Sequence, residues 1–207
     1  MKNKNIVIGF DFDGVIVNSL SVMEKSWKRL NSNNNLNIPF IKYKENIGLK
    51  FNMILDKIGI NENLHNTIYK EYFDGTKEFK NEITLYPYVI ETLTRLKLKS
   101  IPIFIVTSKP RANTLDLLNK FNIEVDLLVC ADDVVNGKPH KESGDLVLDK
   151  FGNSKIYYVG DMESDRQFAK NCKFNFIHAN YGYGSLINPT KFSIKSLRQL
   201  FENVNEL

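Results

Sequence analysis

Two aspartates with one residue between them, Asp11 and Asp13, follow an almost purely apolar run at residues 6–10. A run without polar alternation is typical of a strand that is buried on both faces of a sheet. Burying two neighbouring carboxylates is costly because they repel each other and lose their hydration. A divalent cation or a shared proton would offset this cost. Gly14 comes next, and it would let the backbone turn so that both acids face one space.

Polar side chains also stand where other strand-like runs end or in the loops that follow them: Thr107, Ser108, Lys138, Asp161 and Asp165. Ligands of an open parallel sheet bind beyond the carboxyl ends of its strands, so we expect these groups to meet the two N-terminal aspartates there. Several carboxylates suit a hard cation such as Mg²⁺. A hydroxyl group, backbone amides and a lysine suit the oxygens of a phosphate. An aspartate can attack phosphorus and a second one can move the proton, so the set indicates phosphoryl transfer.

The elements that must position these groups alternate between strands and helices. From residue 85 onward, helical patterns separate short apolar runs. Alternation of this kind predicts an α/β fold with a doubly wound parallel sheet. The strand-like runs of the whole chain lie at residues 6–10, 101–106, 125–129, 156–159 and 174–177.

Residues 18–84 interrupt this alternation with helical patterns only, because apolar residues recur there every three or four positions. The first strand lies before this block and must rejoin the sheet after it, so the block is predicted to be an insertion. We therefore expect a core domain of residues 1–17 and 85–207 and an inserted all-helical domain of residues 18–84. Three polar residues near a turn in the insertion are candidates for substrate specificity: Tyr43, Lys44 and Lys50.

The chain resembles the haloacid dehalogenase (HAD) superfamily through four motifs that occur in the family's order. They lie at residues 11–19 (DFDGVIVNS), 107–108 (Thr-Ser after an apolar run), 137–139 (GKP) and 160–165 (GDMESD). The resemblance is closest to the phosphoglycolate phosphatase-like branch, through TSKPR at 107–111 and the late glycine-rich segment at 182–184. It implies a Rossmann-like HAD core, and the helical insertion resembles the family's C1-type cap domain.

The resemblance implies roles for the residues of the first two motifs. Asp11 would be the nucleophile and a Mg²⁺ ligand. Asp13 would be the general acid and base, with its backbone carbonyl on the metal. Thr107 and the backbone amide of Ser108 would hold the phosphoryl group during its transfer.

The last two motifs would complete the site. Lys138 would neutralise the charge of the nucleophile and of the phosphate, and Asp161 would be a further metal ligand. Asp165 would either belong to the metal shell or orient the lysine. The chain departs from the family at Lys141, where many members carry a second proline after the Lys-Pro pair.

These inferences predict a Mg²⁺-dependent phosphatase that hydrolyses a small phosphate monoester, phosphoglycolate-like or a sugar phosphate, through an aspartyl-phosphate intermediate. A phosphosugar mutase or a pyrophosphatase would use the same core. A carbon–halogen hydrolase is disfavoured, because that chemistry needs neither a metal nor a proton donor at Asp13. Outside the enzymes, the alternatives are a signalling receiver phosphorylated on aspartate, which would lack the helical insertion, and a catalytically silent binding module.

The composition is that of a globular protein with a mildly basic charge. The 207 residues carry a net charge of +4 without a basic stripe that interleaves aromatic residues, so nucleic-acid binding is not indicated. No apolar run is long enough to span a membrane. Cys130 and Cys172 are predicted to be reduced thiols, because no secretion signal is evident. We expect a cytoplasmic monomer or homodimer that binds a small phosphorylated metabolite.

Overall fold

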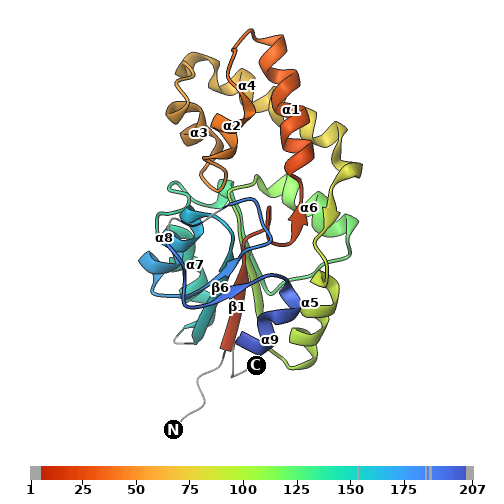
Figure 1. Ribbon diagram of the computed structural model, residues 1–207. Helices are drawn as coiled ribbons and strands as arrows, with labels where there is room; N and C mark the ends of the chain where they lie inside the picture. Colours follow the sequence, from red (N-terminus) through yellow and green to blue (C-terminus); the bar gives the residue numbers. More distant parts are fainter. Residues whose placement is uncertain (1–5, 153, 185, 187, 204–207) are drawn as a thin grey trace.

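The computed structural model describes residues 6–152, 154–184, 186 and 188–203, and Figure 1 shows a core built on a sheet beneath a lobe of helices. Within these residues the main sheet has six strands in the order β5–β4–β1–β6–β7–β8, and every neighbouring pair is parallel. Five strands follow the predicted apolar runs, whereas β8 has two residues, too few to show a pattern. The strands are β1 (Ile6–Phe10), β4 (Ile103–Val106), β5 (Leu127–Val129), β6 (Lys155–Gly160), β7 (Asn175–Ala179) and β8 (Ser193–Ile194).

Helices cover both faces of this sheet, which confirms the predicted doubly wound α/β fold. In Figure 1, α7 and α8 lie on one side of β1 and β6, and α5 and α9 lie on the other. None of the helices in the described ranges combines the length and the apolar character needed to cross a membrane. The helices of the core are α5 (Val89–Leu98), α6 (Arg111–Lys120), α7 (Glu142–Phe151), α8 (Glu163–Cys172) and α9 (Leu200–Asn203).

Two hydrophobic clusters explain why the strands read as unbroken apolar runs. In β4, Ile103 and Ile105 pack into a cluster shared with α5 and α9, whereas Phe104 and Val106 pack into one shared with α7 and α8. Successive side chains of a strand point to opposite faces, and here both faces are covered. The ring of Phe104 lies over Gly9 of β1, where an added Cβ would come within 2.0 Å of the ring.

The helical lobe, which we define as residues 20–82, has a hydrophobic cluster of its own, centred on Trp27, Tyr43 and Tyr72. The chain enters and leaves it through two short antiparallel strands, β2 and β3. The division into a core domain (1–17 and 85–207) and a cap domain (18–84) stays a prediction. The elements here are β2 (Val17–Asn18), α1 (Leu20–Asn33), α2 (Phe40–Lys44), α3 (Phe51–Lys57), α4 (His65–Glu78) and β3 (Thr84–Leu85).

We expect Gly9→Ala to lower the free energy of unfolding by about 1–3 kcal/mol, because the new methyl group would overlap the buried ring of Phe104. Urea denaturation measures the change. Phe104→Leu alone serves as the control, and in its background Gly9→Ala should cost less. An equal cost in both backgrounds would show that the ring is not the cause.

Candidate active site

Three strands bring the predicted site residues to one edge of the sheet. Phe10 is in register with Ile105 of β4 and Val159 of β6. Asp11 directly follows β1, Thr107 follows β4 and Asp161 follows β6. Residues from three distant parts of the chain therefore emerge side by side at the carboxyl ends of parallel strands.

Asp11, Asp161 and Asp165 form a buried group of acids whose carboxylate oxygens lie within 4.8 Å of one another. Asp161 accepts hydrogen bonds through Oδ2 from the backbone N–H groups of Tyr183 (2.7 Å) and Gly184 (3.4 Å). Its Oδ1 is buried and has no hydrogen-bond partner among the described residues. A buried charged oxygen without a partner is costly, so this atom marks a place for a positive ligand.

Lys138 bridges two of these acids. Its Nζ lies 2.8 Å from Asp11 Oδ1 and 2.6 Å from Asp165 Oδ1, and the side chain is only 1% exposed. The ammonium group also donates to Tyr158 Oη at 3.3 Å. Burial lowers the pKa of Lys138, but the charges of Asp11 and Asp165 outweigh it and raise the pKa above its ordinary value. The lysine is therefore charged and held on both sides.

One ammonium group does not balance three carboxylates. Burial, followed by the charge of Asp165, raises the pKa of Asp11 to about 7 and opposes the pull of Lys138. Burial and the charge of Asp165 also raise the pKa of Asp161 well above its ordinary value. A bound divalent cation would relieve both effects, because it stabilises the charged form of each acid.

The donor set fits Mg²⁺. The ion prefers carboxylate oxygens and usually keeps several waters, so one or two protein carboxylates suffice. Asp11 and Asp161 offer such oxygens, and the unpaired Oδ1 of Asp161 supports the fit. Asp165 already binds Lys138 through Oδ1, and its Oδ2 accepts from the backbone N–H of Met162 at 3.0 Å. Its geometry is that of a residue that orients the lysine.

The side chain of Asp13 lies apart from the three acids and has its own partners. Lys109 Nζ lies 3.0 Å from each of its carboxylate oxygens, and the hydroxyl of Ser19 donates to Oδ1. Tyr183 Oη lies 3.0 Å from that serine hydroxyl. Gly14 has a φ of +87° and lies against Asp161, where an added Cβ would come within 2.4 Å of Oδ2.

Lys109 and Ser19 are the partners of Asp13 that sequence reasoning missed. Lys109 directly follows the Thr107-Ser108 pair, and Ser19 ends the segment that begins with Asp11. Both lie inside motifs that the sequence contains, at residues 11–19 and 107–111. Their contacts with Asp13 depend on the conformation of the loops, which the motifs do not specify.

Of the three predicted phosphate-binding residues, Thr107 and Ser108 line the same cavity as Asp11 and Asp13, and Lys138 contacts Asp11. Thr107 Oγ1 accepts the backbone N–H of Lys109 at 3.1 Å, and its own hydroxyl proton stays available to a ligand. The hydroxyl of Ser108 donates to the carbonyl of Gly48 at 2.6 Å. Ser108 therefore connects the edge of the sheet to the helical lobe.

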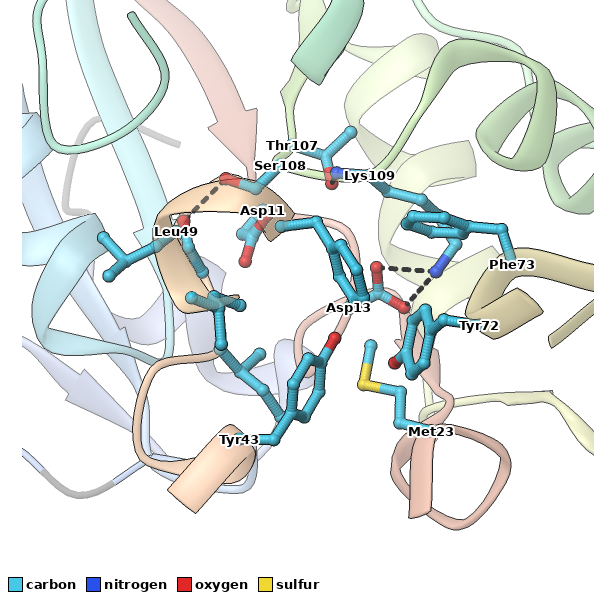
Figure 2. Close-up of a pocket in the computed structure, with 14 residues that line it drawn as sticks. Asp11, Asp13, Met23, Tyr43, Leu49, Tyr72, Phe73, Thr107, Ser108 and Lys109 are labelled. Atoms are coloured by element: carbon cyan, nitrogen blue, oxygen red, sulfur yellow. Dashed lines mark hydrogen bonds and ion pairs between the residues drawn. The ribbon is translucent and has the colours of Figure 1, made fainter. Parts of the chain in front are cut away.

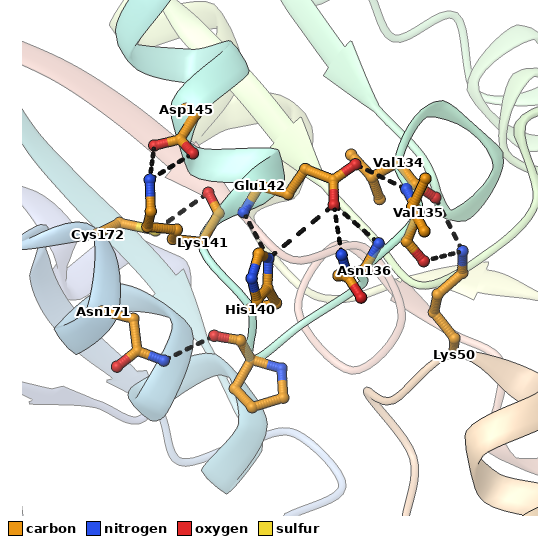
Figure 3. A network of polar contacts seen from close by, with 11 residues as sticks. Lys50, Val134, Val135, Asn136, His140, Lys141, Glu142, Asp145, Asn171 and Cys172 are labelled. Atoms are coloured by element: carbon orange, nitrogen blue, oxygen red, sulfur yellow. Dashed lines mark hydrogen bonds and ion pairs between the residues drawn. The ribbon is translucent and has the colours of Figure 1, made fainter.

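The cavity lies between this edge of the sheet and the helical lobe, with a free volume of about 40 Å³. Figure 2 shows Asp11 and Asp13 on one side of it and the aromatic side chains of the lobe on the other. Of the three specificity candidates, Tyr43 lines the cavity and Lys44 does not. Lys50 instead donates to the carbonyls of Val134 (2.9 Å) and Val135 (3.1 Å), a contact between lobe and core that Figure 3 shows.

Comparison with known proteins places the chain in a family. A model described as haloacid dehalogenase-like hydrolase matches residues 8–179, so the chain belongs to this family. A phosphoglycolate phosphatase of Escherichia coli (strain K12) is 30% identical over 129 residues, which cover 59% of this chain and 49% of that protein. The chain spans about half the length of the curated relatives it matches.

Solved structures share the fold at low sequence identity. A protein from Bacteroides fragilis described as a haloacid dehalogenase-like hydrolase has a TM-score of 0.87 and 23% identity, with 95% of this chain and 100% of that chain covered. A β-phosphoglucomutase from Clostridium difficile has a TM-score of 0.81 and 21% identity, with 97% and 95% covered. At these identities the likeness shows the fold alone.

We expect Lys138→Met to lower the free energy of unfolding at neutral pH by about 3–5 kcal/mol, because it leaves buried carboxylates without their cation. Chemical denaturation in Mg²⁺-free buffer measures the loss. Lys141→Met is the matched control, since that lysine pairs with Asp145 on the surface and its removal should leave the midpoint unchanged. A loss below about 1 kcal/mol for Lys138→Met would contradict the bridging role.

Proposed function

We propose that the chain is a Mg²⁺-dependent phosphatase that hydrolyses a small phosphate monoester through an aspartyl-phosphate intermediate. The observation that carries this proposal is the pairing of a buried Asp11, held by Lys138, with a separate Asp13 at the floor of one cavity. Membership of the haloacid dehalogenase-like hydrolases supports it, as do the phosphoglycolate phosphatases among the curated relatives. The site-residue roles below belong to this proposal.

In the first half-reaction a carboxylate oxygen of Asp11 attacks phosphorus, and the bond between phosphorus and the ester oxygen breaks. Asp13 gives a proton to the departing oxygen, which leaves as an alcohol. Thr107 and the amide of Ser108 hold the oxygens of the phosphoryl group, and Lys138 offsets their charge. Because the reacting groups are held in place before the substrate arrives, positioning supplies much of the rate.

In the second half-reaction water attacks the phosphorus of the aspartyl-phosphate. Asp13 takes the proton of that water, and the bond to Asp11 breaks to release phosphate and restore the carboxylate. Lys109 and Ser19 keep the Asp13 carboxylate in place between the two steps. The ammonium group of Lys109 contacts both carboxylate oxygens of Asp13. The ester oxygen of the substrate must therefore bind Asp13 next to Lys109.

Asp11 and Asp161 would hold the Mg²⁺ ion, with the backbone carbonyl of Asp13 as a further ligand and Asp165 in the surrounding shell. When bound, the ion neutralises charge on the phosphate and on its carboxylate ligands. The helical lobe would act as the cap domain, and its contacts through Ser108 and Lys50 would keep it closed over the site. Closure of this kind excludes bulk water from the reacting groups.

A phosphosugar mutase or a pyrophosphatase would use the same acids. In a mutase the sugar phosphate must turn over within the site between the two transfers, whereas the curated relatives that the chain matches are phosphoglycolate phosphatases. We therefore favour hydrolysis. Measuring phosphate release and sugar-phosphate isomerisation side by side separates the two activities. The cytoplasmic location and the monomer-or-homodimer state stay predictions of the sequence.

We expect Asp13→Asn to lower kcat/KM, which reports the first half-reaction, by about 10²–10⁴-fold for an alkyl phosphate and much less for an aryl phosphate, because the aryl leaving group departs without a proton. Steady-state phosphate release measures both rates. Asp11→Asn should abolish both, and Asp145→Asn on the exposed face of α7 should change neither. Equal slowing of the two substrates by Asp13→Asn would contradict its role as the acid.

We expect Mg²⁺ to raise the melting temperature of the protein, because an ion that binds only the folded state stabilises it by about 2.7 kcal/mol at a hundred times its Kd. Thermal denaturation with and without Mg²⁺ measures the shift. The shift should disappear in Asp161→Asn and persist in Asp145→Asn. A shift that survives Asp161→Asn would mean that the ion binds elsewhere.

A further inference from the structure

The wall of the cavity that faces Asp13 carries no charge. The residues that the helical lobe contributes to this wall, all within the described part of the chain, have apolar or phenolic side chains or are glycine. They are Met23, Tyr43, Ile47, Gly48, Leu49, Phe51, Ile54, Tyr72 and Phe73. In the proposed reaction this wall would surround the alcohol part of the substrate, which leaves with a proton from Asp13.

The cation nearest to this wall is already committed. Lys109 is the one ammonium group among the residues that line the cavity, and it contacts both oxygens of Asp13. Elsewhere in the lobe, Arg29 pairs with Glu78 on the outer surface, and Lys50 donates to the carbonyls of Val134 and Val135. A second negative charge on the leaving group would therefore enter an apolar pocket beside an aspartate without a free cation. Burying an unpaired charge in such a place is strongly unfavourable.

The wall nevertheless offers a hydrogen-bonding group. The hydroxyl of Tyr72 is buried, and the residue is 1% exposed. Among the described residues the hydroxyl of Tyr43 is the neighbour that can share its proton, and no hydrogen bond of regular geometry satisfies it. Burial, followed by the neighbouring Tyr43, raises the pKa of Tyr72 well above its ordinary value, so the hydroxyl keeps its proton. Its ring is fixed by Phe51 and Phe73, with centroids at 4.8 and 5.2 Å. Figure 2 shows Tyr43 and Tyr72 facing the space beside Asp13.

We infer that the preferred substrate is the phosphate ester of a small, uncharged alcohol that carries one further hydroxyl group, and not an ester whose alcohol carries a carboxylate. The further hydroxyl would satisfy Tyr72, and the carbon atoms would pack against the apolar wall. This inference rests on the proposed phosphatase function and narrows its substrate class. It favours a neutral ester over phosphoglycolate.

The direct test compares hydroxyethyl phosphate with phosphoglycolate, which differ in carrying CH₂OH or COO⁻ at the same position. With wild-type protein and Mg²⁺, we expect kcat/KM to be at least about tenfold higher for hydroxyethyl phosphate, the preference that one unpaired buried group typically produces. Equal values, or a preference for phosphoglycolate, would overturn the inference. Para-nitrophenyl phosphate is assayed in parallel. If para-nitrophenyl phosphate is hydrolysed but phosphoglycolate is preferred over hydroxyethyl phosphate, only the substrate inference fails. If none of the phosphate esters is hydrolysed, the proposed phosphatase function fails as well.

A second measurement isolates the hydroxyl of Tyr72. Ethyl phosphate lacks the further hydroxyl group, so the ratio of kcat/KM for hydroxyethyl over ethyl phosphate reports that contact. Tyr72→Phe should lower this ratio by about tenfold. Tyr69→Phe is the matched control, because Tyr69 lies on the same helix, is 38% exposed and does not line the cavity; it should leave the ratio unchanged. An unchanged ratio in Tyr72→Phe would overturn the assignment of this hydroxyl.

Discussion

The charge balance around Lys138 is the constraint on which the rest of the site depends. Asp11, Asp161 and Asp165 are buried together, and the one lysine between them contacts two of the three. Buried charges of this kind persist only when each finds a partner. The lysine and backbone amides supply part of what is needed, and the unpaired oxygen of Asp161 shows where a further positive ligand belongs. The site thus has fewer positive than negative charges. A bound Mg²⁺ ion would supply the missing positive charge in the proposed reaction.

The fold produces this arrangement in two ways. Parallel strands bring residues from distant parts of the chain to one edge, and the missing side chain of Gly14 lets the first loop pack closely against Asp161. Asp13 is held by Lys109 and Ser19, so the two aspartates of the first motif have different electrostatic surroundings. The helical lobe closes the space above them with aromatic carbon and with phenolic hydroxyls. A small uncharged leaving group matches that space better than an anion does.

Much of the fold could be predicted from the sequence, because strands buried on both faces read as unbroken apolar runs and the helices between them show regular spacing. The two-residue strand β8 was missed, since so short a segment carries no pattern. Site residues at strand ends could be located because the topology fixes that edge. Lys109 and Ser19 could not be assigned as partners of Asp13, and the contact of Lys50 with the carbonyls of Val134 and Val135 could not be predicted. Such contacts depend on loop paths and on lobe closure, which local patterns do not encode.

In the proposed reaction, Asp11 of this charge-deficient site carries the phosphoryl group during turnover. The most direct measurement is acid quenching of the protein with a phosphate ester and Mg²⁺, followed by peptide mass spectrometry to locate the added phosphoryl group. The substrate is an aryl phosphate, whose leaving group needs no proton. With it, Asp13→Asn slows mainly the attack of water, so the intermediate should accumulate. The account predicts one hydroxylamine-sensitive phosphoryl group on Asp11. A phosphoryl group on another residue, or turnover without any phosphorylated protein, would contradict it.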